Sequence, residues 1–100
     1  MGTPADRPAA RLFVGVDIAA TTFTTTWSQD TQPAVRPLTF NQTPAGFAAF
    51  QQQLDQTGIA PNATLIVMEA TGSYWITLAV TLYESGYAVS VINPTQVMTI

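Results

Sequence analysis

Apolar and polar positions alternate along the first part of the chain in the pattern of an antiparallel sheet. Residues 11–19 (RLFVGVDIA) are rich in Val and Ile and predict a strand. In residues 22–28, Phe23, Thr25 and Trp27 alternate with threonines, which suits a second strand. A third run, residues 34–41, contains a proline and therefore predicts an edge strand. Three short strands with brief connections are typical of a meander.

The hydrophobic period then changes to that of a helix. Thr43 and Pro44 are the N-cap and first-turn residues expected at a helix start. Apolar residues recur at helical spacing from Phe47 to Leu54, and Gly58 predicts the end of the helix.

The second half of the chain predicts a strand–helix–strand unit. Residues 63–72 contain a continuous apolar run, as in a buried strand. We expect Ser73 to cap a helix with Trp75, Leu78, Ala79 and Leu82 on its apolar face and its end at Gly86.

Residues 87–92 predict the fifth strand, and Asn93-Pro94 is expected to open a third helix. The predicted order is β-β-β-α-β-α-β, an α/β fold with a mixed sheet and a right-handed parallel crossover. Residues 1–10 are expected to form a disordered leader before a single domain, residues 11–100.

Composition excludes several kinds of chemistry. The chain has no Cys and no His, so it has no disulfide, no zinc or haem site of the usual kind, and no His-based catalytic pair. Any catalysis must use carboxylates. Its apolar runs are far shorter than the roughly 20 residues of a membrane helix, and no signal peptide is evident, so we expect a soluble, cytoplasmic protein.

Charge argues that this sequence is part of something larger. Three basic residues, none of them lysine, stand against six acidic ones, and the net charge of −3 is unlike that of a stand-alone nucleic-acid binder. Only 9% of the residues are charged, which is little for a self-sufficient soluble surface.

Two of the six acids occupy unusual positions. Asp17 lies inside an apolar strand, and Glu69 ends the most hydrophobic strand of the chain. A buried, unpaired carboxylate costs several kcal/mol, and Arg11, the basic residue on the Asp17 face, is about 20 Å away along its strand. If the two strands pair in parallel, the two Cα atoms approach to about 5 Å, and a divalent cation, Mg²⁺ or Mn²⁺, would relieve the repulsion.

A plainer explanation stays open beside the metal. Both acids lie near strand ends and would be satisfied by backbone amides or by the hydroxyls of Thr21, Thr71 and Ser73. The turn formed by Thr71, Gly72 and Ser73 either caps a helix or presents amides to a phosphate, and Tyr74 either caps the helix or stacks on a nucleobase.

Several motifs resemble the insertion-sequence-110 family of transposases. These are VGVDIA at 14–19, FNQTPAGFAAFQQQL at 40–54, and above all VMEATGSYWITLAVTLYESGYAVSVINPTQV at 67–97, in the family's order and spacing. The resemblance covers residues 12–100. It departs from the family after Asp17, where Ala19 to Thr22 stand in place of a frequent lysine, and one expected phosphate contact is lost.

The resemblance implies a ribonuclease H-like, RuvC-like catalytic domain with an Asp-Glu-Asp-Asp set of metal ligands. Asp17 and Glu69 would be the first two ligands and catalytic residues, with Mg²⁺ or Mn²⁺ as the cofactor. The other two aspartates lie further along in the family, as does a second domain with a strand-exchange serine. We therefore expect the N-terminal part of a catalytic domain, truncated before its last helices and inactive alone.

The implied activity is the cutting and joining of DNA strands by the full-length transposase. The implied partners are DNA and a guide RNA, with no membrane. We also expect a homo-oligomer, because a sheet that lacks its last helices exposes apolar surface.

Two alternatives belong to other classes of protein. VGVDIAATT also resembles the first phosphate-binding loop of actin-like and sugar-kinase-like ATPases, although Ala19 stands where that loop has glycine. A non-catalytic interaction module is the third possibility.

Overall fold

The computed structural model describes residues 10–29, 34–69, 72–92 and 97–99, and the side chains among them as far as Ile92. The elements are β1 (Leu12–Ile18), β2 (Thr22–Gln29), β3 (Leu38–Asn41), α1 (Pro44–Asp55), a 3-10 turn (Pro61–Ala63), β4 (Thr64–Glu69), α2 (Ile76–Glu84), β5 (Ala88–Ile92) and β6 (Val97–Thr99). Within the described ranges, neither helix is long and apolar enough to cross a membrane.

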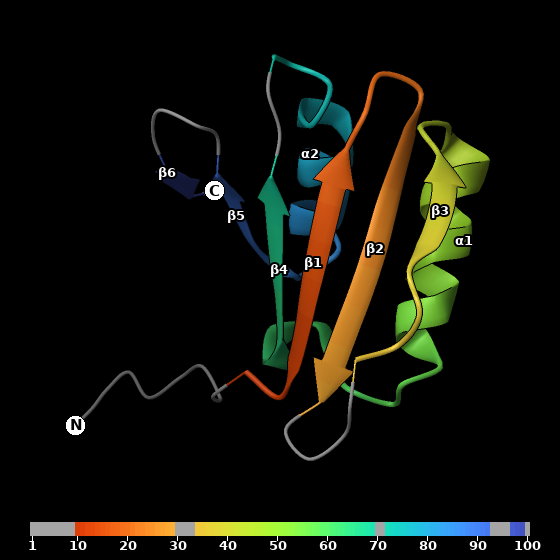
Figure 1. Ribbon diagram of the computed structural model, residues 1–100. Helices are drawn as coiled ribbons and strands as arrows, with labels where there is room; N and C mark the ends of the chain where they lie inside the picture. The colour runs from red at the N-terminus through yellow and green to blue at the C-terminus, as the bar shows by residue number, and fades with distance from the viewer. Residues whose placement is uncertain (1–9, 30–33, 70–71, 93–96, 100) are drawn as a thin grey trace.

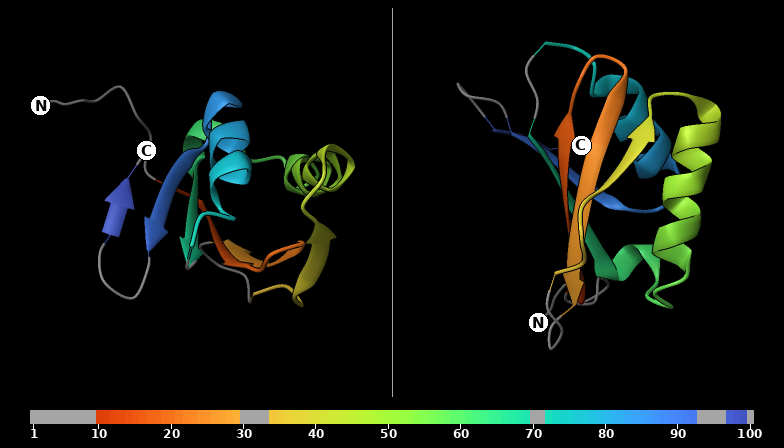
Figure 2. Two further views of the ribbon diagram at one scale, coloured as in Figure 1. Left: turned by 90° about the horizontal axis from the view of Figure 1, so that it is seen from above. Right: turned by 45° about the vertical axis from the view of Figure 1, so that its right-hand side comes forward.

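One six-stranded sheet organises the chain, in the order β3-β2-β1-β4-β5-β6 (Figure 1). The pair β1/β2 is antiparallel, as is β2/β3, whereas β1/β4 and β4/β5 are parallel. The predicted meander, mixed sheet and parallel crossover are therefore confirmed. Both helices cover the same face of the sheet, as the view from above shows (Figure 2).

The core lies between this face and the helices. Alternate residues of β1 are buried, namely Leu12, Val14 and Val16, and β2 and β4 follow the same period. Under α1, Phe23, Phe40, Phe47, Phe50 and Trp27 form a cluster with ring centroids 5.5 to 6.4 Å apart. Such pairs each add about 0.5–1.5 kcal/mol to the burial of their area. This aromatic cluster fixes α1 to β2 and β3.

The opposite face of the sheet has no helix over it in the described part of the chain (Figure 2). Phe13 is 44% exposed there, Leu65 and Val67 are half-buried, and Asp17 and Glu69 are exposed. We call this surface the open face. Its apolar middle and acidic end are presented on the same side of the sheet.

The start of α1 is built as the sequence predicts. Thr43 Oγ1 accepts a hydrogen bond from the Gly46 amide at 3.1 Å, and Pro44 occupies the first turn. Gly46 lies against the backbone of Asn41: a Cβ at this position would overlap the Asn41 carbonyl oxygen and lie 2.8 Å from its carbon. The first turn of α1 therefore packs directly on the last residue of β3.

Two local predictions need correction. The third strand is only Leu38–Asn41, because it starts after Pro37, which has no amide hydrogen for the ladder. Ser73 is not the cap of α2: the helix begins at Ile76, and Trp75 in the cap position makes no side-chain cap bond. The reason is a separate turn, in which the Ile76 amide donates to the Ser73 carbonyl and Trp75 Nε1 donates to the Gly72 carbonyl.

Residues 97–99 form a strand where a third helix was expected. Val97–Thr99 form β6, which pairs antiparallel with β5, whereas residues 93–96 lie outside the described residues. Most of the predicted leader, residues 1–9, also lies outside them. The expected helix ends are confirmed, since α1 stops at Asp55 shortly before Gly58 and α2 stops at Glu84 before Gly86.

Replacing Gly46 by Ala tests the contact between α1 and Asn41. Helix propensity alone predicts that Gly46→Ala stabilises the chain by about 0.5–1 kcal/mol. We expect the opposite sign, a loss of about 1–3 kcal/mol, because the added methyl group must displace backbone. Urea unfolding measures it, with exposed Ala49→Gly in the same helix as the control for propensity. A Gly46→Ala chain as stable as the wild type would refute the close contact.

Candidate metal centre

The parallel pairing of β1 with β4 brings the two unusual acids together. Asp17 is the register partner of Glu69, and the preceding pairs down the two strands are Val16 with Met68 and Gly15 with Val67. Neighbouring strands lie about 4.8 Å apart, so the two Cα atoms are about 5 Å from each other. The predicted juxtaposition of the acids is confirmed.

Both acids belong to the open face. In β1 the buried residues Val14 and Val16 alternate with exposed Gly15 and Asp17. In β4 the exposed terminal residue is Glu69, which follows the fully buried Met68. Side chains of paired residues in register point to the same side of a sheet, so both carboxylates project from the open face into solvent.

A shallow pocket of about 330 Å³ contains both acids. Its lining includes Asp17 and Glu69, the backbone of Gly15, and the threonines Thr24 and Thr26 of β2. Thr24 is the register partner of Asp17 on the other side of β1, and its hydroxyl lies 3.0 Å from that of Thr39 on β3. The pocket therefore places two carboxylates beside a row of hydroxyls.

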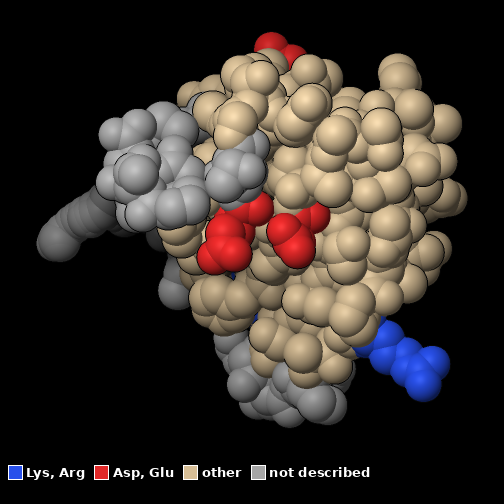
Figure 3. Space-filling model, turned by 45° about the horizontal axis from the view of Figure 1, so that its top comes forward, with Lys and Arg blue, Asp and Glu red and all other residues tan. Residues whose placement is uncertain are grey.

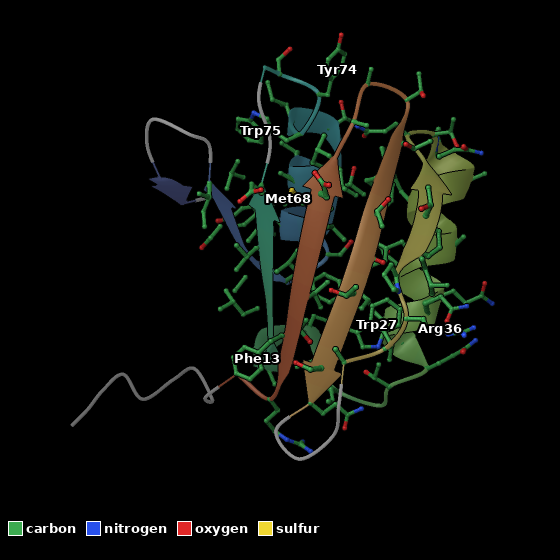
Figure 4. All side chains as sticks on the ribbon, in the orientation of Figure 1. Phe13, Trp27, Arg36, Met68, Tyr74 and Trp75 are labelled. Atoms are coloured by element: carbon green, nitrogen blue, oxygen red, sulfur yellow. The ribbon has the colours of Figure 1, made fainter. Side chains whose placement is uncertain are left out.

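Basic side chains lie away from this pocket. Arg11 precedes β1, at the opposite end of the strand from Asp17. Arg36 lies below and to the right in Figure 4, far from the end of β1. Figure 3 shows two acidic side chains next to each other near the middle of the view, with further acidic atoms at its upper edge and a basic side chain at its lower right. Arg7 lies outside the described residues.

Local hydrogen bonds do not favour the plainer explanation of the acids. Thr21 and Ser73 form hydrogen bonds through their backbone carbonyls, which accept from the amides of Gln42 and Ile76. Thr71 lies outside the described residues. The pair thus offers two exposed carboxylates, whose oxygens are ligands of the kind that Mg²⁺ and Mn²⁺ prefer.

Two carboxylates do not complete such a site. No group of three or more His, Cys, Asp or Glu residues gathers anywhere in the described ranges. A hexacoordinate ion would take its other oxygens from water, from a phosphate, or from further acids. The carboxylate oxygens are suitable ligands for a divalent cation, but these two residues alone do not complete its coordination shell.

The turn after Glu69 carries the predicted nucleic-acid contacts. Gly72, Ser73 and Tyr74 are exposed, and Tyr74, at 57% exposure, points away from the body of the molecule (Figure 4). Trp75 is instead partly buried against the core, as its apolar spacing predicts. Since α2 begins only at Ile76, the amides of Gly72 and Ser73 are not those of a helix N-terminus.

Sequence patterns do not identify Gln42, which contacts the loops that follow the two acid-bearing strands. Gln42 lies between β3 and α1, and its side-chain amide donates to the carbonyls of Ala19 at 2.9 Å and Tyr74 at 3.0 Å. These partners are 23 and 32 residues away in the sequence, so only the tertiary structure brings them together. An Asn-Gln-Thr string before a helix predicts a cap and nothing more.

A mixed sheet with an antiparallel β1/β2/β3 meander, parallel β4 and β5, and acids at the ends of β1 and β4 defines a ribonuclease H-like domain. Solved structures share this fold. RuvC of T. thermophilus in complex with Holliday junction substrate superposes with a TM-score of 0.58 at 9% identity, over 84% of this chain and 65% of that chain. A second Thermus thermophilus RuvC structure gives 0.54 at 11% identity, over 83% and 64%.

Comparison with a family model identifies the family of this chain. The family model of DEDD transposases of the insertion-sequence-110 type matches residues 14–100, and the chain belongs to this family. It spans just under two thirds of the length of the RuvC chains that it matches. No curated protein matches the sequence.

A third structural likeness concerns another class of protein. An exopolyphosphatase from Cytophaga hutchinsonii gives a TM-score of 0.52 at 13% identity, over 83% of this chain and 34% of that chain. At such identities, likeness shows the fold alone. The match to the transposase family therefore distinguishes between the two classes where the fold does not.

A titration with Mn²⁺ tests whether the acids bind a cation together. We expect Mn²⁺ to raise the melting temperature of the chain, since a ligand at ten times its Kd stabilises the folded state by about 1.4 kcal/mol. In a domain of this size, that corresponds to roughly 5–10 °C. Asp17→Asn and Glu69→Gln should each abolish the increase, whereas Asp55→Asn on α1 should keep it. An equal increase in all four proteins would show that the cation binds elsewhere.

Proposed function

We propose that this chain forms the N-terminal part of the catalytic domain of a transposase that cuts and joins DNA strands with divalent metal ions. The observation that supports this most directly is the register of Asp17 with Glu69, both exposed in one pocket, in a chain of the transposase family. The RuvC structure in complex with a Holliday junction supports DNA as the substrate.

Asp17 and Glu69 would hold Mg²⁺ or Mn²⁺ through their carboxylate oxygens. A bound divalent cation supplies Lewis-acid stabilisation of charge on a phosphoryl group and activation of water. The two strands fix the spacing of the ligands, because both carboxylates project from backbone that is hydrogen-bonded into the middle of the sheet. The hydroxyls of Thr24 and Thr39 would lie beside the DNA backbone, where neutral donors suit a phosphate.

The remaining ligands would come from protein that is not in this sequence. The resemblance to the family implies two further aspartates, and the open face is the surface on which the element that carries them would pack. Exposed Phe13 and half-buried Leu65 and Val67 form its apolar part, on the stretches of β1 and β4 that precede the acids. Packing there would bury this apolar surface and bring new side chains to the edge of the pocket.

Tyr74 would contact DNA next to the reacting phosphate. Its ring is exposed and projects from the turn that follows Glu69, and Gln42 holds its backbone carbonyl. An exposed aromatic ring with a fixed backbone can stack on a nucleobase without losing much conformational freedom. Thr71, Gly72 and Ser73 belong to the same proposed contact surface.

Further partners of the complete transposase rest on the resemblance. We include a guide RNA, assembly as a homo-oligomer and a cytoplasmic location, which the absence of cysteine suits. Since the chain has a net charge of −3, the basic surface that binds nucleic acid would lie in the remainder of the protein.

The ATPase alternative agrees less well with the β1–β2 turn. A phosphate-binding loop needs free backbone amides, whereas the Ala19 amide donates to the Thr22 carbonyl at 2.9 Å. The carbonyls of Ala19 and Thr21 are in turn bound by Gln42. The turn is closed on itself and on the loop between β3 and α1. Micromolar ATP binding by the complete protein would favour the alternative over the transposase.

Removal of either acid should abolish strand cleavage by the complete transposase. We expect Asp17→Asn and Glu69→Gln to lower the cleavage rate by at least about a hundredfold, because even residues that only support a metal ligand cost 10–100-fold. DNA binding should persist in both variants. Cleavage of a labelled DNA substrate measures the effect, with Asp55→Asn as the matched charge control. Normal cleavage by either acid variant would contradict the proposed site.

Truncation of Tyr74 should weaken DNA binding and spare the fold. Loss of one base–aromatic stack costs about 1–3 kcal/mol, so Tyr74→Ala should lower DNA affinity by roughly 5- to 150-fold. Tyr74→Phe keeps the ring and should bind like the wild type. Fluorescence anisotropy with a labelled DNA measures both. Equal affinity for Tyr74→Ala and wild type would exclude the stacking contact.

A further inference from the structure

Gln42 connects the two loops that follow the acid-bearing strands. Its Nε2 donates to the carbonyl oxygens of Ala19 at 2.9 Å and Tyr74 at 3.0 Å. Ala19 comes two residues after Asp17, and Tyr74 comes five residues after Glu69. One side-chain amide thus binds the turn beyond β1 and the turn beyond β4 at once. We call this pair of hydrogen bonds the Gln42 bridge.

Gln42 is itself held firmly in place. Its backbone amide donates to the Thr21 carbonyl at 2.8 Å, in the same β1–β2 turn that its side chain reaches. The preceding residue, Asn41, ends β3 and is packed against Gly46, and the following residue, Thr43, caps α1. The side chain therefore extends from a fixed point of the backbone.

The chemistry of both contacts calls for an NH₂ group. Each partner is a carbonyl oxygen, which only accepts, and a primary amide has two N–H donors on one nitrogen. A glutamate of the same length has no donor when ionised, and an asparagine is one methylene shorter. Among residues of this shape, glutamine alone supplies two donors at this reach.

We propose that Gln42 is a positioning residue. It fixes the turn after β1, which contains Ala19, relative to the turn after β4, which contains Tyr74. The proposal rests on the proposed function, since it gives Gln42 the role of setting the Tyr74 contact relative to the two carboxylates. Gln42 touches neither acid. It acts through the two backbone carbonyls. DNA that binds at Tyr74 is thereby positioned relative to the carboxylates of Asp17 and Glu69.

The chain offers a matched control for the test. Gln51 on α1 is half-buried like Gln42, and its Nε2 donates to Ser85 Oγ at 3.2 Å. Gln42→Glu and Gln51→Glu make the same change of charge at the same side-chain length. The Ser85 hydroxyl donates to the Thr81 carbonyl at 3.0 Å and can turn to donate to a carboxylate at position 51, whereas a carboxylate at position 42 faces two carbonyls and can bond to neither.

Amide hydrogen exchange on the chain of 100 residues is the first measurement. The Ala19 amide, bonded to the Thr22 carbonyl, reports the first turn, and the Ile76 amide, bonded to the Ser73 carbonyl, reports the second. In Gln42→Glu, we expect both amides to exchange about five- to tenfold faster, as for the loss of one hydrogen bond each. The core amide of Ile66 should be unaffected, and Gln51→Glu should match the wild type at all three positions.

Two results of the exchange experiment would overturn the bridge. One is unchanged exchange at Ala19 and Ile76 in Gln42→Glu. The other is an equal increase at Ile66, which would mean that Gln42 supports overall stability and not the relation between the two turns.

Strand cleavage by the complete transposase is the second measurement. Gln42→Glu should lower kcat about tenfold or more, while Gln51→Glu keeps it, because misplacement of a bound substrate by about 1 Å can cost a hundredfold. Wild-type kcat in Gln42→Glu, with cleavage abolished by Asp17→Asn, would refute the positioning role alone. Cleavage that persists in Asp17→Asn would instead refute the proposed function, and the exchange result would still decide whether the bridge exists.

Discussion

The parallel register of β1 with β4 links the hydrophobic core to the position of the acids. A shift of one residue would turn every side chain of one strand to the other face of the sheet, so the burial of the apolar side chains determines the register. Val14, Val16, Ile66 and Met68 are buried under the helices only in the observed register. The same register leaves Asp17 opposite Glu69 on the open face. The hydrophobic core therefore sets the geometry of the candidate metal centre.

The two faces of the sheet have different roles. The aromatic cluster under α1 and the apolar side of α2 make one face a complete core, whereas the open face combines partly exposed apolar residues with the two acids. Two adjacent carboxylates repel each other in the absence of a cation. The exposed part of the Phe13 ring contributes no burial of apolar surface to stability. Both features become favourable when a divalent ion and a further packing element are present, as we propose for the complete catalytic domain. The low charge of the chain agrees with this division.

The sequence predicts most of the fold, because each strand buries one face and each helix one side. The alternation from Leu12 to Val16, the helical spacing from Phe47 to Leu54 and the exceptional positions of Asp17 and Glu69 are all local patterns. Predictions failed where several local solutions have similar energies, as at Ser73, where a separate turn replaces the cap, and after Ile92, where β6 replaces a helix. The Gln42 bridge could not be predicted from the sequence, because its partners are distant along the chain and come together only in the folded structure.

We propose that Asp17 and Glu69 bind one divalent cation between them. A crystal structure of the chain grown with Mn²⁺, with anomalous diffraction recorded at the manganese edge, tests this binding. We expect an anomalous peak on the open face, with carboxylate oxygens of both residues at coordination distances of about 2.0–2.6 Å. A peak bound by only one of the two acids, or no peak at this site with Mn²⁺ present in excess, would contradict it.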